Sequence, residues 1–173
     1  MFSGQLPPYL EPRKFADQER VVEGEARVGD LPRLREYRES LDQPVRVSLA
    51  FGRDEDGRRR VQGRVETSLV LVCQRCLGTV GFDISSQFNI GLVFSDEQAK
   101  HLPKRLEPVE MDENGQLDLW EVVEDEILLN LPEFPMHPEG ECRMYKSESD
   151  NEPEADVKKE NPFDVLAKLK QKQ

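Results

Sequence analysis

Residues 61–71 read VQGRVETSLVL and residues 80–94 read VGFDISSQFNIGLVF, two runs in which apolar and polar side chains alternate. A period of two is the pattern of a β-strand with one buried and one solvated face. Residues 45–51, VRVSLAF, have the same period, and a turn from Asp54 to Gly57 follows them. Because one-sided alternation with tight connections is typical of antiparallel sheets, these runs predict three consecutive antiparallel strands.

Helical patterns lie on both sides of these runs. Residues 31–41 place leucines at helical intervals after Asp30 and predict a short helix. Residues 95–115 are polar and are expected to form a loop. Asp118 with Glu121 forms a capping-box pattern that opens an acidic helix, and its apolar stripe is expected to pack on the sheet. The packing side holds Leu119, Val123 and Ile127, and the expected solvent side holds Glu121, Glu124 and Asp125.

The composition predicts one modest domain with polar ends. The 173 residues are 36% hydrophobic and 34% charged, which suffices for a single core. We expect an α+β domain over residues 1–143, an antiparallel sheet with the acidic helix covering it. Residues 144–160, dominated by Ser, Glu, Asp and Lys, predict a disordered linker. Residues 161–173 begin with Asn-Pro, a helix-start signal, and predict a short amphipathic helical tail.

Charge and cysteine usage limit the class of function. The formal net charge of −11 argues against a protein that coats nucleic acid, because such binding needs many Lys and Arg side chains. The charge is uneven, since residues 107–126 hold nine acidic residues and no basic one. No apolar run approaches the ~20 residues of a membrane span, and three cysteines cannot all pair within one chain. We therefore expect a cytoplasmic protein in a reducing compartment.

Four residues have the spacing and chemistry of a metal site. Cys73-x-x-Cys76 lies between the second and third predicted strands, and His137 and Cys142 follow in a Pro- and Gly-containing loop. Zinc takes four tetrahedral N or S ligands, so these residues predict a structural Zn2+ with no open position for substrate. The alternative is a pair of small hydrophobic side chains at a strand end, with an unrelated His and Cys. A thiol redox site is disfavoured because a strand, not a helix, follows Cys76.

Arginines gather around the first predicted hairpin. They predict an RNA-backbone contact, whereas the alternative is a solvated hairpin neutralised by Asp54, Glu55 and Asp56. No aromatic side chain interleaves with them in the sequence, which gives base stacking no support. The candidate RNA-binding residues are Arg53, Arg58, Arg59, Arg60, Arg64 and Arg75.

Two further segments are candidates for protein contacts. Residues 107–126 could hold a basic partner such as a ribosomal protein or a nuclease segment, or could simply be a solubilising surface. In the tail, Phe163, Leu166 and Leu169 either dock in the groove of a partner or fold back on their own domain, and we favour the partner. No Gly-rich phosphate loop or nucleophile–base pair appears, so we expect a binding protein, not an enzyme, with no small-molecule substrate.

Several stretches together resemble the large ribosomal RNA subunit accumulation protein family, YceD. The resemblance rests on residues 71–76, residues 123–132, the Pro-Met-His at 135–137 with Cys142, and residues 161–170. It implies a role in the synthesis, processing or stability of large-subunit ribosomal RNA, with that RNA or a pre-ribosomal particle as partner. The alternative is a protein-only adaptor that recruits or restrains a ribonuclease or chaperones a basic ribosomal protein.

Overall fold

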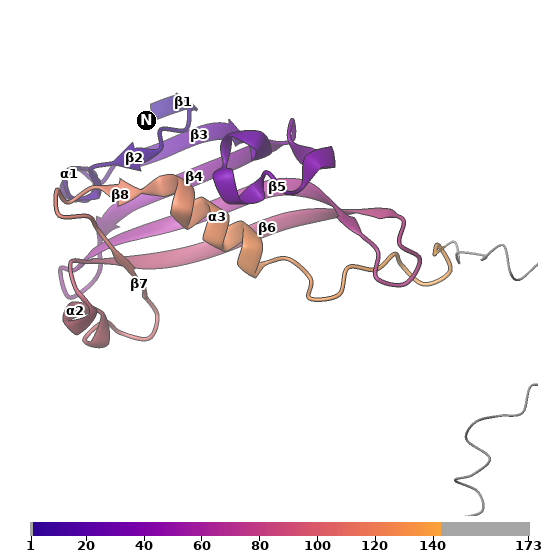
Figure 1. The fold of residues 1–173 in the computed structure, drawn as a ribbon. Coiled ribbons are helices and arrows are strands. Elements are labelled where there is room, and N and C mark those ends of the chain that lie inside the picture. The colour runs from indigo at the N-terminus through magenta and orange to yellow at the C-terminus, as the bar shows by residue number, and fades with distance from the viewer. Residues whose placement is uncertain (1, 143–173) are drawn as a thin grey trace, which may run out of the picture. The chain divides into compact units, whose positions relative to one another are not determined.

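The computed structural model describes residues 2–142, which form one large sheet with a layer of helices and turns on one face (Figure 1). The sheet has six strands in the order β1-β3-β4-β5-β6-β7. Its inner strands are antiparallel, whereas β1 and β7 run parallel to their neighbours at the two edges. The predicted α+β class is confirmed. The strands are β1 (Phe2–Gln5), β3 (Val21–Arg27), β4 (Pro44–Arg53), β5 (Arg59–Val72), β6 (Thr79–Val93) and β7 (Glu107–Glu110).

The register of the central strands places alternate side chains in one core. Val65 of β5 lies opposite Val47 of β4 and opposite Ser86 of β6, and all three are buried. A slip of one residue would turn this whole set to the solvent face, so the apolar alternation fixes the pairing. The three antiparallel strands predicted from the sequence are confirmed.

The covering layer contains α3 (Leu119–Leu129), which Figure 1 shows across one face of the sheet. Leu119, Val123 and Ile127 are fully buried, as the apolar stripe predicts. The Asp118 carboxylate caps the helix by accepting a hydrogen bond from the Glu121 backbone N–H at 3.0 Å. The layer also holds α1 (Pro12–Asp17), and the short strands β2 (Tyr9–Leu10) and β8 (Leu117–Asp118), which pair with each other.

The expected solvent exposure of Glu124 is wrong. Its side chain is buried and accepts a hydrogen bond from the Arg33 backbone N–H at 2.8 Å. The acceptor satisfies a backbone donor that Arg33 would otherwise leave unpaired beneath α3. The spacing of residues along α3 could not predict this contact, because Arg33 lies in a distant segment of the chain.

The helix predicted for residues 31–41 is also wrong, because the structure has short 3-10 turns there. Their backbone bonds join residues three apart, as in Leu34 N–H to Leu31 C=O at 3.2 Å. The chain then follows the sheet closely enough for the buried Ser40 hydroxyl to accept a hydrogen bond from Val70 N–H at 2.7 Å. The turns are η1 (Val28–Asp30), η2 (Pro32–Leu34) and η3 (Arg38–Ser40).

The segment expected to be a loop, residues 95–115, contains α2 (Asp96–Lys100) and edge strand β7. Leu102 packs directly on Gly91 of β6, where a Cβ atom would lie 2.7 Å from its Cδ1. Phe94 departs from the alternation of β6, because it is 42% exposed although the period of two places it on the buried face. The chain packs on both faces of the sheet here, so one-sided alternation ends at Gly91.

No helix within residues 2–142 is long and apolar enough to cross a membrane. The predicted linker, residues 144–160, and the predicted tail, residues 161–173, lie outside the described residues. Both remain predictions.

The pairing of β5 with β6 depends on a glycine under an aromatic ring. Gly63 lies opposite Phe88, and a Cβ atom at Gly63 would lie 2.0 Å from Phe88 Cζ. We predict that Gly63→Ala destabilises the domain by about 1–3 kcal/mol, because the ring must leave its position. Thermal unfolding checks this, with Gly81→Ala as the control, since a Cβ there meets nothing within 4 Å. Equal melting temperatures for the two variants would contradict this reading of the hairpin.

Candidate functional site

A tight turn between β5 and β6 brings two thiols to one side. The Cys73 backbone N–H donates to the Gly78 carbonyl at 2.8 Å, and Leu77 N–H donates to the Cys73 carbonyl at 2.9 Å. Leu77 takes a left-handed backbone conformation, with φ of 59°, which lets the chain reverse within the turn. The Cys73 and Cys76 side chains therefore leave the turn together.

The loop after α3 docks on this turn and brings the other two residues. Gln74 N–H donates to the Pro135 carbonyl at 2.8 Å, and the Arg75 guanidinium donates to the His137 carbonyl at 3.1 Å. The four ligand atoms of Cys73, Cys76, His137 and Cys142 all lie within 4.8 Å of one another. We call this group the Cys3His cluster, and it could hold a metal ion.

The distances in the Cys3His cluster fit tetrahedral zinc. Two thiolates on one tetrahedral zinc lie about 3.8 Å apart, and a thiolate and an imidazole nitrogen about 3.6 Å apart. The Cys73 and Cys142 sulfurs are 3.8 Å apart, and the Cys76 sulfur lies 3.4 Å from His137 Nδ1. His137 Nε2 lies 2.9 Å from the Thr79 carbonyl, which can only accept, so Nε2 carries the proton. In the neutral imidazole, Nδ1 then has its lone pair on the side of the thiols.

The electrostatics of the thiols also favour a bound cation. Burial raises the pKa of Cys73, but hydrogen bonds from the backbone N–H groups of Cys76 and His137 outweigh it and bring the pKa to about 5. The Gly78 N–H lowers the pKa of Cys76, whereas its hydrogen bond with Cys142 and its burial raise it, with a net rise. The negative charges of neighbouring thiolates repel one another, so the three cysteines resist losing all their protons. A divalent cation among them would offset this repulsion.

The predicted RNA-binding arginines lie in different surroundings. Arg53 and Arg59 contact the Asp17 carboxylate from β4 and β5, at 2.6 Å and 3.2 Å. The hydrogen bonds from Arg59 and then Arg53 lower the pKa of Asp17. Arg64 pairs with Glu66 at 2.5 Å on the open face of the sheet. All these groups are partly exposed, and such pairs contribute only about 0–1 kcal/mol each.

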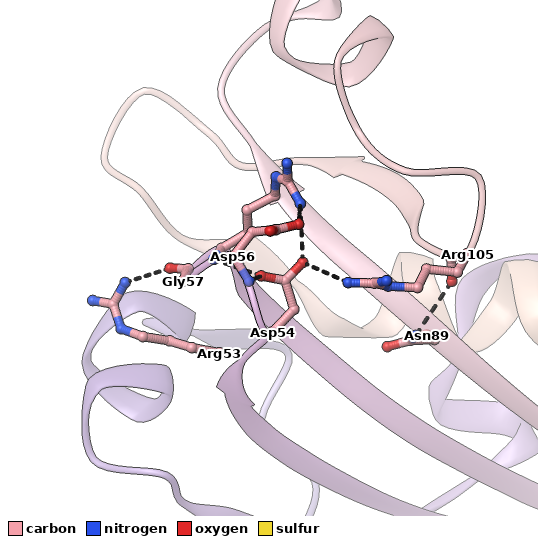
Figure 2. A network of polar contacts seen from close by, with 7 residues as sticks. Arg53, Asp54, Asp56, Gly57, Asn89 and Arg105 are labelled. Atoms are coloured by element: carbon pink, nitrogen blue, oxygen red, sulfur yellow. Dashed lines mark hydrogen bonds and ion pairs between the residues drawn. The ribbon is translucent and has the colours of Figure 1, made fainter.

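A polar network orders the hairpin tip between β4 and β5 (Figure 2). Asp54 accepts from Arg105 at 3.3 Å and from Arg58, which also contacts Asp56. Arg53 donates to the Gly57 carbonyl at 2.7 Å and so holds the opposite side of the turn. The turn acids thus neutralise part of the tip, as the alternative interpretation proposed.

Arg60 and Arg75 are the two members of the predicted set that have no carboxylate partner among residues 2–142. The Arg75 guanidinium donates to the His137 carbonyl and so helps to hold the loop that carries His137 against the turn between β5 and β6. The RNA-binding assignment of the six arginines stays a prediction.

Next to the hairpin tip is a hollow that we call the basic pocket, with a volume of about 360 Å3. Arg13 of α1 lies over the Phe94 ring, with its Cζ 5.4 Å from the ring centroid. No carboxylate is among the described residues that line the pocket. Its polar and aromatic lining residues are Arg13, Arg58, Arg59, Phe94, Gln98 and His101.

Sequence reasoning missed Arg13, Phe94 and His101. They come from α1, the end of β6 and the end of α2, so only the fold brings them to the tip of the β4–β5 hairpin. The exposure of Phe94 supplies the aromatic group that the arginine-bearing hairpin lacks in its own sequence. The tail residues Phe163, Leu166 and Leu169 lie outside the described residues.

The fold and the cluster define a class: a two-layer α+β protein with a Cys3His cluster joining a strand turn to the loop after its covering helix. Residues 61–170 match the family model described as large ribosomal RNA subunit accumulation protein YceD. A relative of that name from Haemophilus influenzae is 35% identical over 170 residues, which are 97% of this chain and 98% of the relative. The chain belongs to the YceD family. No solved structure matches it.

We predict that the purified full chain contains about one zinc per chain, because the cluster brings four N and S ligand atoms within 4.8 Å of one another. Metal analysis by mass spectrometry measures this directly. Cys142→Ser should lower the zinc content at least tenfold, since one ligand is lost, whereas His101→Ala, away from the cluster, should leave it unchanged. Less than a tenth of an equivalent of any metal in the unaltered chain would contradict the prediction.

Proposed function

We propose that this chain supports the accumulation of large-subunit ribosomal RNA by binding a ribosomal RNA or ribonucleoprotein intermediate at its basic pocket, without catalysing a reaction. The family name and the curated relative's name support the RNA class. The observation that carries the binding site is a hollow on an acidic chain whose described lining residues include three arginines and no carboxylate.

The chemistry of the basic pocket suits a single-stranded or looped RNA segment. Arginine guanidinium groups donate paired hydrogen bonds to a phosphate, and an exposed aromatic ring offers a stacking surface for an unpaired base. Arg13 and Phe94 already form a cation–π pair, so the ring and a guanidinium are held together before RNA arrives. The pocket therefore combines both contacts that recognise RNA of this kind.

The ion pairs beside the pocket can be exchanged for phosphate. Arg58 and Arg59 line the pocket while their carboxylate partners, Asp54, Asp56 and Asp17, do not. The Arg58–Asp56 and Arg59–Asp17 pairs are partly exposed and therefore weak, so a phosphate in the pocket competes with them at little cost. The Asp54 side chain is buried and also accepts hydrogen bonds from the backbone N–H groups of Asp56 and Arg58, so it stays in place when Arg58 turns to a phosphate. The neighbouring carboxylates limit the affinity of the pocket for RNA. They disfavour RNA that contacts it through phosphates alone, without a stacked base.

We further infer that the Cys3His cluster holds a structural Zn2+. When bound, the ion would fasten the loop of residues 130–142 to the turn between β5 and β6. That fastening fixes where the chain leaves the domain towards residues 144–173. Four protein ligands would leave the ion no open position, which suits a structural role.

The rival function is a protein-only adaptor that recruits or restrains a ribonuclease or chaperones a basic ribosomal protein. It is favoured by the acidic surface along α3, which repels RNA. The two functions differ in whether RNA binds the purified chain at all.

We predict that Arg13→Gln, Arg58→Gln and Arg59→Gln together weaken binding of a large-subunit ribosomal RNA fragment and flatten its salt dependence. Each lost phosphate contact should lower the slope of log K against log[salt] by about 0.7–0.9. The measurement is a filter-binding titration at several salt concentrations.

The matched control combines Arg27→Gln, Arg35→Gln and Arg38→Gln, which change the net charge equally on exposed residues outside the pocket. It should change the affinity less than twofold. If the unaltered chain binds no RNA, or if both triple variants lose equal affinity, the basic pocket is not the RNA site. Absence of RNA binding would favour the adaptor.

A further inference from the structure

A second hollow, which we call the acidic groove, runs between edge strand β7 and helix α3 and has a volume of about 710 Å3. Its lining contains no Lys, Arg or His among the described residues. The acidic lining residues are Glu107, Glu110, Asp112, Asp118, Glu121, Asp125 and Glu126.

Few of these carboxylates have a cationic partner within residues 2–142. Asp125 pairs with Arg33 at 2.5 Å on the outer side of α3. Asp112 and Asp118 accept hydrogen bonds from backbone N–H groups, which leaves their charge uncompensated. Glu107, Glu110 and Glu121, all exposed, have no ion pair in the described part of the chain. The groove thus offers an unneutralised negative lining.

Glu126 adds an observation independent of surface charge. It is only 8% exposed, and its Oε2 accepts a hydrogen bond from the Ser86 hydroxyl at 2.8 Å. Its Oε1 receives no hydrogen bond from any described residue, and no cation lies beside it. Burial first, then Glu107 and Asp125, raise the pKa of Glu126. A cationic side chain in the groove would pair with Glu126 and offset the burial of its carboxylate.

The apolar part of the groove indicates which kind of cationic ligand would fit it. Tyr9 and Leu129, which line it, are 56% and 77% exposed, so apolar surface faces solvent beside the carboxylates. A hydrated metal ion cannot cover such surface, and RNA is repelled by the acids. A polypeptide with both basic and apolar side chains satisfies both features. The remaining apolar lining residues are Ile90, Val109, Met111, Leu117 and Val122.

We propose that the acidic groove binds a Lys/Arg-rich segment of a partner protein, with basic side chains on the carboxylates and an apolar side chain over Leu129 and Tyr9. Charge complementarity selects the partner's chemistry, and the groove's length along α3 gives room for several residues. The inference goes beyond the proposed RNA contact and does not depend on it. Met111 lines both hollows, so a basic protein segment and an RNA would bind on neighbouring surfaces.

The test is fluorescence anisotropy of the full chain with a labelled peptide of arginine and leucine residues. The groove variant combines Glu107→Gln, Glu110→Gln and Glu121→Gln, which keep the size of each side chain. Its affinity for the peptide should fall about tenfold, because three exposed charge contacts are lost. The control variant combines Glu23→Gln, Glu97→Gln and Glu139→Gln, exposed residues outside the groove, and should change affinity less than twofold.

Three outcomes overturn the proposal. Equal losses in both variants would show non-specific attraction to a negative chain. No binding by the unaltered chain would show that the groove has no such ligand. Binding that appears only after deletion of residues 161–173 would show that the chain's own lysine-bearing tail is the occupant. Titration of the same groove variant with the ribosomal RNA fragment should show unchanged affinity, so failure of this proposal and failure of the RNA proposal give different results.

Discussion

The pairing of β5 with β6 is the constraint on which the rest of the structure depends. These strands pair from Arg60 opposite Gly91 to Val72 opposite Thr79, and the ring of Phe88 fills the space over Gly63. One end of the pair continues into the turn that carries Cys73 and Cys76. The other end joins the arginine-bearing tip and the chain that leads to α2. A single register therefore sets the position of both the cluster and the basic pocket.

The same pairing positions the acidic side of the molecule. The Ser86 hydroxyl of β6 donates a hydrogen bond to Glu126 of α3, which forms one wall of the groove. Strand β7 extends the sheet beyond β6 and forms the other wall. The acidic groove and the basic pocket are thus neighbouring hollows that share Met111 in their lining. A chain with a net charge of −11 still presents a local cationic surface here, because the described lining of the basic pocket holds three arginines and no carboxylate.

Local patterns predicted the parts of this arrangement that depend on neighbours in sequence. The alternation over residues 45–94 and the capping residue Asp118 determined the central strands and the start of α3, since both rest on periodicity and backbone chemistry. The spacing of Cys73 and Cys76, with His137 and Cys142 later, was enough to select the four residues of the cluster. The parts that were missed, such as Phe94 beside Arg13 and the burial of Glu124, depend on packing between segments far apart in the chain. The 3-10 turns replace a helix because they let Ser40 and the neighbouring leucines follow the sheet.

The proposed contact of this acidic chain with ribosomal RNA lies at the basic pocket. The most direct test is ultraviolet crosslinking in cells, followed by mass spectrometry of the peptides that carry RNA. Crosslinks are expected on the peptides that contain Phe94 or His101, because an exposed ring beside arginines is placed to contact a base. Crosslinks confined to the acidic groove, or a complete lack of large-subunit ribosomal RNA on the protein, would contradict the proposed contact.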